Sequence, residues 1–129
     1  MGIDATLAGA FVGGDVVTCT VTPEDGTDSG TAVAASVTIA NTAPVLASAS
    51  LTPNPATESD TLSCAPGSVT DADGSTSFTY SYAWTVNGVT IAATSSSLTG
   101  TYFAAADAVA CVVTANDGTS SSAATPETL

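Results

Sequence analysis

Thiols and carboxylates are the side chains of this sequence that could take part in chemistry. The cysteines are Cys19, Cys64 and Cys111. If the chain resides in an oxidising compartment, an odd number predicts one intramolecular disulfide and one thiol whose partner lies elsewhere. His, Lys and Arg are all absent, so no basic side chain can activate a serine or lower the pKa of a cysteine thiol. The sequence therefore predicts that the protein is not an enzyme.

The carboxylates offer a different chemistry in the motif Asp71-Ala72-Asp73-Gly74. Oxygen ligands on a tight loop that contains glycine suit Ca²⁺, and Asp60 or Asp107 could add a further ligand. The same motif is also an ordinary turn, in which the aspartate accepts backbone hydrogen bonds and the glycine adopts a positive φ. No bidentate glutamate of an EF-hand follows it. Two interpretations of this motif are therefore open: calcium held by Asp71 and Asp73, or a structural turn without any cofactor.

The charge balance excludes several partners. Twelve Asp and Glu residues with no Lys or Arg give a formal net charge of −12. Binding to nucleic acid is excluded, because the phosphates would repel this chain. Side-chain salt bridges cannot form, so we expect metal cations or high ionic strength to stabilise the protein. No apolar run is long enough to cross a bilayer, so we expect no membrane insertion.

Alternating residues predict strands throughout the chain. The clearest case is 77–91, where Phe78, Tyr80, Tyr82, Trp84 and Val86 fall on one face. The dipeptide Asn87-Gly88 then supplies the residues of a type I′ turn. This segment is predicted to be a hairpin with an aromatic inner face.

Further strands follow the same two-residue period. Residues that share a face are Leu62 with Cys64, Val109 with Cys111 and Val113, Val17 with Cys19 and Val21, and the alternate positions from Val33 to Ile39. The last strand, at 123–129, contains Pro126, and we expect the proline to interrupt it. No segment has helical periodicity, and turn residues recur about every 8–12 residues. These patterns predict an all-β, antiparallel β-sandwich.

One strand pattern occurs twice. Val16–Thr22 with Asp25-Gly26-Thr27 recurs as Ala108–Thr114 with Asp117-Gly118-Thr119, and the two cysteines involved are 92 residues apart (111 minus 19). That period is the length of one small β-sandwich. We therefore expect residues 43–129 to be a complete repeat, and residues 1–42 to be a partial one holding only its last three strands, E, F and G.

A set of motifs resembles a known family. The motifs are Asn41-Thr42-Ala43-Pro44, the Asp71–Gly74 turn, Tyr82–Gly88, and Asp107–Cys111 leading to Asn116–Thr119. Together they resemble the tandem Ig-like or PKD-like repeats of large bacterial extracellular surface proteins and adhesins. The resemblance implies an Ig-like sandwich, an extracellular or cell-surface location, and a structural or adhesive role. Similar family members often carry calcium in such loops.

The order Cys64, Trp84, Cys111 resembles the cysteine of strand B, the tryptophan of strand C and the cysteine of strand F in immunoglobulin domains. It implies an intradomain disulfide between Cys64 and Cys111 that packs on Trp84. Closing this loop of 47 residues (111 minus 64) would contribute about 3–4 kcal/mol. Cys19 then lacks a strand B partner and is available for an intermolecular bridge. The predicted core comprises Trp84, Tyr82, Leu62, Val109 and Val113.

The partial repeat exposes an apolar face and unpaired strand edges. The chain could be a piece of a longer tandem array, a subunit completed by strands of a neighbour, or a rearranged pair of partial domains. We expect the second: a filament subunit that self-associates through β-strand complementation into a homopolymer. The alternative is a stalk or adhesive binding module from a tandem-repeat bacterial surface protein, in contact with adjacent repeats. Tyr102 is the best candidate for a ligand contact there, and packing of Tyr102 within a strand is the expected role.

Overall fold

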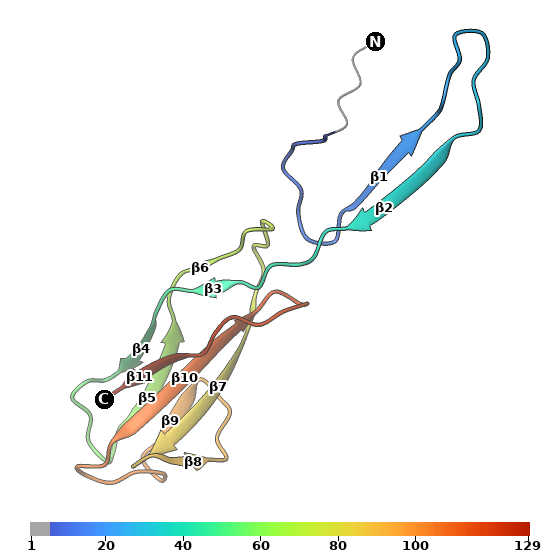
Figure 1. The fold of residues 1–129 in the computed structure, drawn as a ribbon. Coiled ribbons are helices and arrows are strands. Elements are labelled where there is room, and N and C mark those ends of the chain that lie inside the picture. Colours follow the sequence, from blue (N-terminus) through green and yellow to red (C-terminus); the bar gives the residue numbers. More distant parts are fainter. Residues whose placement is uncertain (1–5) are drawn as a thin grey trace. The chain divides into compact units, whose positions relative to one another are not determined.

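A computed structural model describes residues 6–129 of the chain. The chain divides into two compact units, Met1–Thr42 and Ala43–Leu129. Every strand pair in the described residues is antiparallel, and they contain no helix (Figure 1). The predicted all-β class is therefore confirmed.

The first unit is a hairpin of strands β1 (Val16–Val21) and β2 (Val33–Thr38). No strand precedes β1 in the described part, although a strand E was expected within residues 1–42. The second unit explains why: its β9 is held by β5, with Leu98 opposite Leu62. Residues 6–42 hold no counterpart of β5, so a strand E would have nothing to pair with.

The second unit is a sandwich of two main sheets. One sheet has the order β11-β10-β7-β8 and the other β4-β5-β9, while β3 pairs with β6. The strands are β3 (Val45–Leu46), β4 (Ala49–Thr52), β5 (Thr61–Pro66), β6 (Val69–Thr70), β7 (Thr79–Val86), β8 (Val89–Ile91), β9 (Ser97–Thr99), β10 (Val109–Asn116) and β11 (Thr125–Thr128).

The core lies between these sheets, and β10 shows the pattern most clearly. Its residues alternate between buried and half-buried, so one side faces the core along the whole strand. Of the predicted core residues, Trp84, Leu62, Val109 and Val113 are at most 1% exposed, whereas Tyr82 is half-buried against the cluster. The other buried apolar residues are Leu46, Leu51, Cys64, Leu98, Phe103, Cys111 and Ala115.

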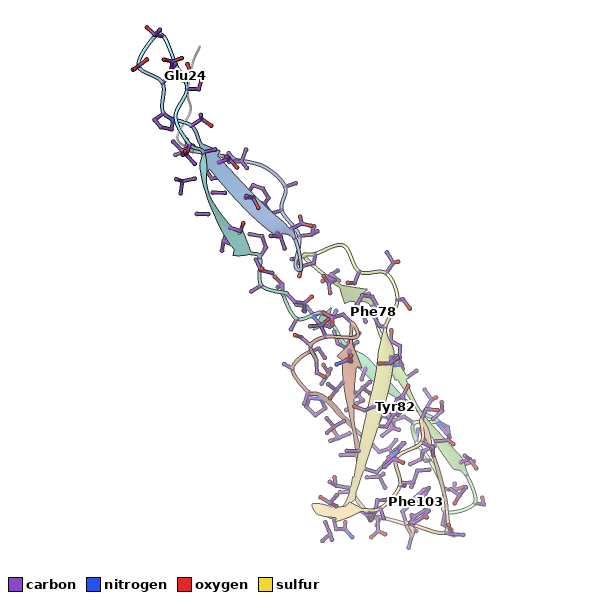
Figure 2. All side chains as sticks on the ribbon, turned by 90° about the vertical axis from the view of Figure 1, so that its right-hand side faces the viewer. Glu24, Phe78, Tyr82 and Phe103 are labelled. Carbon is purple, nitrogen blue, oxygen red and sulfur yellow. A yellow bond between two sulfur atoms is a disulfide. The ribbon has the colours of Figure 1, made fainter. Side chains whose placement is uncertain are left out.

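The aromatic inner face of β7 is shorter than predicted. Trp84 is fully buried, but Tyr80 is 38% exposed, and Phe78 lies before the strand begins (Figure 2). The strand has eight residues, whereas the facing strands β5 and β9 have six and three. Burial along this face of β7 is complete at Trp84 and only partial at Tyr80, although Ala115 opposite Tyr80 is buried.

The turn predicted at Asn87-Gly88 is present, whereas the strand interruption predicted at Pro126 is not. Asn87 and Gly88 both have positive φ, 52° and 79°, as a type I′ turn requires, and Val86 pairs with Val89. The expected interruption at Pro126 is wrong, because β11 continues through it with Pro126 opposite Val112. Strand β11 is at the edge of its sheet, where the missing N–H of proline is tolerated.

Trp84→Ala is expected to destabilise the second unit by about 3–5 kcal/mol, because it leaves a cavity beside the disulfide. Chemical denaturation followed by far-UV circular dichroism, without reductant, measures the loss. Tyr102→Ala is the matched control, since its ring is 49% exposed and its removal should change stability little. Equal effects of the two substitutions would contradict the placement of the core.

Candidate functional site

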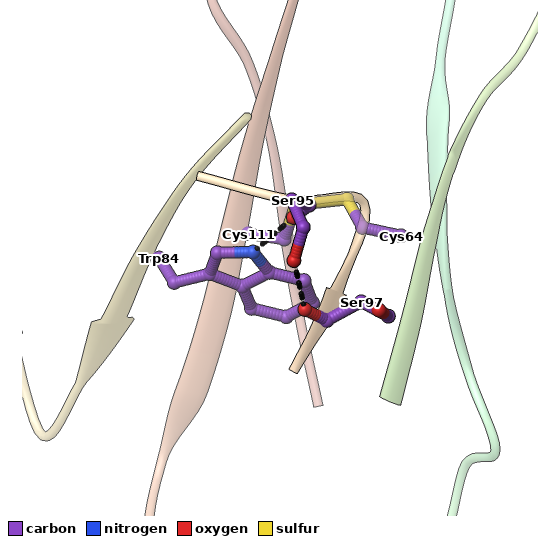
Figure 3. The surroundings of a disulfide bond; sticks show 5 residues. All are labelled: Cys64, Trp84, Ser95, Ser97 and Cys111. Atoms are coloured by element: carbon purple, nitrogen blue, oxygen red, sulfur yellow. Dashed lines mark hydrogen bonds between the residues drawn. A yellow bond between two sulfur atoms is a disulfide. The ribbon is translucent and has the colours of Figure 1, made fainter. Parts of the chain in front are cut away.

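The expected disulfide between Cys64 and Cys111 is present, and it joins the two sheets through β5 and β10 (Figure 3). The Cα atoms are 6.4 Å apart, and both residues are at most 1% exposed. Trp84 lies beside it, opposite Cys111 on β7, and its indole N–H donates to the Ser95 carbonyl at 2.9 Å. A disulfide buried in this way is a structural link and is shielded from attack.

Cys19 has the opposite environment. It is a free, exposed thiol on β1, opposite Ala35 of β2. Residues that share its side of the hairpin alternate along both strands, and we call this set the Cys19 face: Val17, Cys19, Val21, Val33, Ala35 and Val37.

The hairpin β1–β2 repeats the hairpin β10–β11 in its hydrogen bonds as well as in its sequence. In the turn before β1, the Val12 N–H donates to Asp15 Oδ2 at 3.1 Å. In the turn before β10, the Ala104 N–H donates to Asp107 Oδ2 at 2.8 Å. Each residue of the second pair follows its counterpart by the same 92 positions, so the repeat includes the entry into the hairpin.

The loops at the far end of the two hairpins also match. Asp25 Oδ1 accepts the N–H groups of Thr27 and Asp28, both at 2.9 Å. Asp117 Oδ1 likewise accepts the N–H groups of Thr119 and Ser120, both at 2.7 Å. Local sequence alone therefore builds the same hairpin in two different surroundings.

The burial of the two hairpins differs sharply. Val109 and Val113 are at most 1% exposed, because the strands of the facing sheet cover them. On the Cys19 face, Val21, Val33 and Val37 are 61%, 70% and 59% exposed. A contiguous exposed apolar face of this kind indicates an interaction surface.

Within residues 6–42, the outer edges of β1 and β2 are also unpaired. Strand β10 has β7 on one side and β11 on the other, whereas β1 has β2 on one side alone. Exposed strand edges carry N–H and C=O groups that are ready to pair with another strand. The Cys19 face and these edges together are the candidate functional site, and the sequence analysis named only Cys19 from it as a site residue.

Three carboxylates have lowered pKa values, and each serves a local turn. The Asp28 N–H lowers the pKa of Asp25 most, and the Thr57 N–H lowers that of Asp60 most. For Asp107 the largest cause is the side-chain amide of Asn87, 2.8 Å away. Asp60 and Asp107, considered above as extra calcium ligands, are thus already occupied by hydrogen bonds that hold turns.

The Asp71–Gly74 turn has one feature that fits a cation. Asp71 Oδ1 accepts the Asp73 N–H at 2.7 Å, while Asp71 Oδ2 is buried without a hydrogen-bond partner. However, residues 6–129 contain no group of three or more Cys, Asp or Glu side chains that could hold a metal, and Ca²⁺ takes six to eight oxygen ligands. The side chains alone fall short of that set, and calcium at Asp71 and Asp73 stays a prediction.

Two further surface features lie in loops of the described chain. The hollows at the tip of the first hairpin are lined by residues of the loop 23–30, and Figure 2 labels Glu24 there. Tyr102 is half exposed, and its backbone N–H donates to Thr99. In the described part of the chain, no helix has the length and apolar character needed to span a membrane.

Asp107→Asn is expected to destabilise the protein at about pH 7, with the difference from the parent protein vanishing in acid. Because the folded-state pKa is lowered, the stabilisation is present above the ordinary value of 3.8 and is lost as the pH falls through the folded value. Urea midpoints measured down to about pH 2 check this. Asp28→Asn removes the same charge from the other unit and should leave the midpoint of the second unit unchanged. A difference that persists in acid would contradict the prediction.

Calcium chloride is expected to raise the Tm more than sodium chloride at equal ionic strength, because coordination adds to the screening of carboxylate repulsion. Asp71→Asn should remove the excess, and Asp28→Asn should keep it. Differential scanning calorimetry measures both. Equal shifts with the two salts would show that screening is the whole effect and that no calcium site exists.

Comparison with known proteins assigns no family to this geometry. No protein-family model, no curated protein and no solved structure matches the chain. The duplicated hairpin, once covered and once uncovered, is therefore the observation on which a function can be built.

Proposed function

We propose that the chain is an extracellular structural protein, an Ig-like subunit of a fibre assembled by β-strand complementation. The observation that supports this is the duplicated hairpin. In the second unit, the sandwich strands cover one face of β10–β11 and bury Val109, Cys111 and Val113. In the first unit, the equivalent Cys19 face is open. Strands of the same kind, supplied by another copy, complete the first unit.

Covering the Cys19 face contributes a gross free energy, from which the cost of freeing the covering strands is subtracted. Burying an exposed valine contributes about 1.5 kcal/mol or more, and Val21, Val33 and Val37 are all more than half exposed. Pairing of a donated strand with the open edge of β1 adds main-chain hydrogen bonds. Because the acceptor face and the donating strands lie in different parts of the chain, the contact is heterologous and propagates into an open polymer.

Charge and redox state support an extracellular setting. Disulfides such as Cys64–Cys111 persist in oxidising compartments and are rare in reducing ones. A net charge of −12 without a single basic side chain makes copies repel one another at low ionic strength. Assembly therefore requires salt or cations, which extracellular fluids supply.

A stalk module of tandem repeats is the second candidate, and the regularity of the repeat favours it. The matching turns at Asp15 and Asp107 and the common period of 92 residues are typical of arrays in which each repeat contacts its neighbours. In that case the covering strands belong to the same polypeptide, and isolated copies of this chain do not assemble.

Val37→Asp is expected to abolish assembly, because it places a charge in the apolar contact. Ser36→Asp adds the same charge to the other side of β2 and should leave assembly intact. Sedimentation velocity in physiological salt, with and without reductant, separates monomers from high-order species. A monodisperse parent protein whose Cys19 reacts fully with a thiol reagent would contradict the fibre and favour the stalk.

A further inference from the structure

We propose that the β1–β2 hairpin of one copy replaces the β10–β11 hairpin in the sandwich of another copy. It lies beside β7 and over β5 of that second copy, and Cys19 replaces Cys111 in the disulfide with Cys64. This inference rests on the proposed strand complementation and names the segments that carry it out. The two hairpins compete for one set of acceptor strands, β3 to β9.

The inward-facing residues of the two hairpins are nearly interchangeable. In the second unit, Val109, Cys111 and Val113 of β10 lie opposite Val86, Trp84 and Tyr82 of β7, respectively. The residues 92 positions earlier are Val17, Cys19 and Val21. Strand β1 would therefore bring the same three side chains to β7, with Cys19 opposite Trp84 and facing Cys64.

Pro23 would prevent β1 from serving as a central strand if its position had to donate a backbone hydrogen bond to β7, because proline has no N–H group. Its counterpart is Ala115, whose N–H donates to Ser122 Oγ and whose carbonyl accepts the Ser122 N–H. Both backbone groups of Ala115 therefore point away from β7. In the first hairpin, the Pro23 carbonyl accepts the Gly30 N–H at 2.8 Å, so proline at this position loses no bond to β7.

The turn before each hairpin also contains an aspartate at the position that Asn87 contacts. Asn87, in the β7–β8 turn, donates to Asp107 Oδ1 at 2.8 Å and accepts the Ala108 N–H at 3.0 Å. Asp15 stands in the same turn before β1. After exchange, Asp15 and Val16 can make the two hydrogen bonds that Asp107 and Ala108 make now.

Strand β2 is better suited to the sandwich than the strand it would replace. The positions of β11 on the core side are Thr125, Glu127 and Leu129, opposite Val113, Cys111 and Val109. Their counterparts in the first hairpin are Val33, Ala35 and Val37. Exchange thus replaces a half-buried carboxylate by a methyl group, which favours burial. It also replaces a pairing of four residues by one of six.

The covalent step is a thiol–disulfide exchange that needs no oxidant. The Cys19 thiol loses its proton, and its sulfur attacks Cys64 Sγ. A bond forms between Cys19 and Cys64, the Cys64–Cys111 bond breaks, and Cys111 leaves as a thiolate that takes up a proton. Because Cys64 and Cys111 are buried, β10–β11 must leave the sandwich first. The exchange therefore belongs to folding or to transient opening.

The acceptor strands are assigned to a second copy, because the connection to a chain's own β3 would have to be almost fully extended. Thr125 Oγ1 donates to the Leu46 carbonyl at 3.5 Å, so β3 lies at the start of β11. The counterpart of Ile39 would lie six residues beyond Thr125, roughly 20 Å further along the strand. The seven steps from Ile39 to Leu46 span at most about 24 Å, which leaves only about 4 Å for the chain to reverse direction.

Oxidative refolding at several protein concentrations tests the exchange. The reduced, denatured protein is refolded in a thiol redox buffer, free thiols are blocked, and the product is cleaved at Asp and Glu, since the chain has no Lys or Arg for trypsin. Mass spectrometry then locates the disulfides. The expected result is an interchain Cys19–Cys64 link that rises with concentration, accompanied by blocked Cys111.

Matched variants connect the link to the hairpin contact. Val21→Asp should reduce the Cys19–Cys64 product more than about tenfold, a loss of at least 1.4 kcal/mol, whereas Thr20→Asp on the other side of β1 should leave it unchanged. In Cys111→Ser, Cys19 of each copy should join Cys64 of the next, giving a ladder on non-reducing gels. The double variant Cys111→Ser with Cys19→Ser should give no ladder.

A single Cys64–Cys111 link at every concentration, with Cys19 blocked throughout, would overturn the exchange. A Cys19–Cys19 link in its place would overturn it as well. Sedimentation of the same samples separates the two proposals. If assembly that depends on Val37 persists without a Cys19–Cys64 link, complementation stands and hairpin exchange fails. If the protein is monomeric, both fail.

Discussion

The link between Cys64 and Cys111, packed beside Trp84, is the interaction on which the second unit depends. Its core is built largely from small and medium-sized side chains, and Trp84 is the largest that is fully buried. A core of this kind offers limited hydrophobic free energy, so a covalent bond between the sheets supplies a large share of the stability. Any hairpin that takes the place of β10–β11 must therefore also supply the cysteine.

The first unit shows what the same hairpin is without that link. Its turns and register form without covering strands, because they depend on residues within the hairpin: Asp15 and Asp25 hold the turns, and cross-strand pairs such as Val17 with Val37 fix the register. What it lacks is burial of the Cys19 face. An isolated two-stranded hairpin is marginally stable in water, so both proposals supply the missing layer from strands outside this unit.

The carboxylates have a consistent role in a chain without basic side chains. Asp25, Asp60, Asp107 and Asp117 all accept backbone N–H groups in turns. Such hydrogen bonds stabilise the ionised form without a counter-charge. The acidic residues therefore shape the connections between strands, and their mutual repulsion makes association sensitive to salt.

The resemblance to immunoglobulin domains implied the pairing of Cys64 with Cys111. Local patterns in the sequence were sufficient for the longer strands β1, β2, β5, β7 and β10, the Asn87-Gly88 turn and the duplication of the hairpin. Each depends on a two-residue period, a turn requirement or the order of a few motifs, all of which act over short distances. Tertiary structure decided which residues of each strand are buried and which strands lie at a sheet edge. Tyr80 has the same alternation as Trp84 but is 38% exposed, and Pro126 is tolerated because β11 is an edge strand.

For the candidate site too, one part could be predicted from the sequence and the other part only from the structure. Sequence identified Cys19 as the unpaired thiol and predicted an apolar face around it. Three features became visible only in the structure: residues 6–15 contain no strand E, β1 pairs with β2 alone in the described part of the chain, and Pro23 keeps its hydrogen bond to Gly30. Burial depends on which strands are present to cover a face, whereas alternation along one strand reports only that the face is apolar.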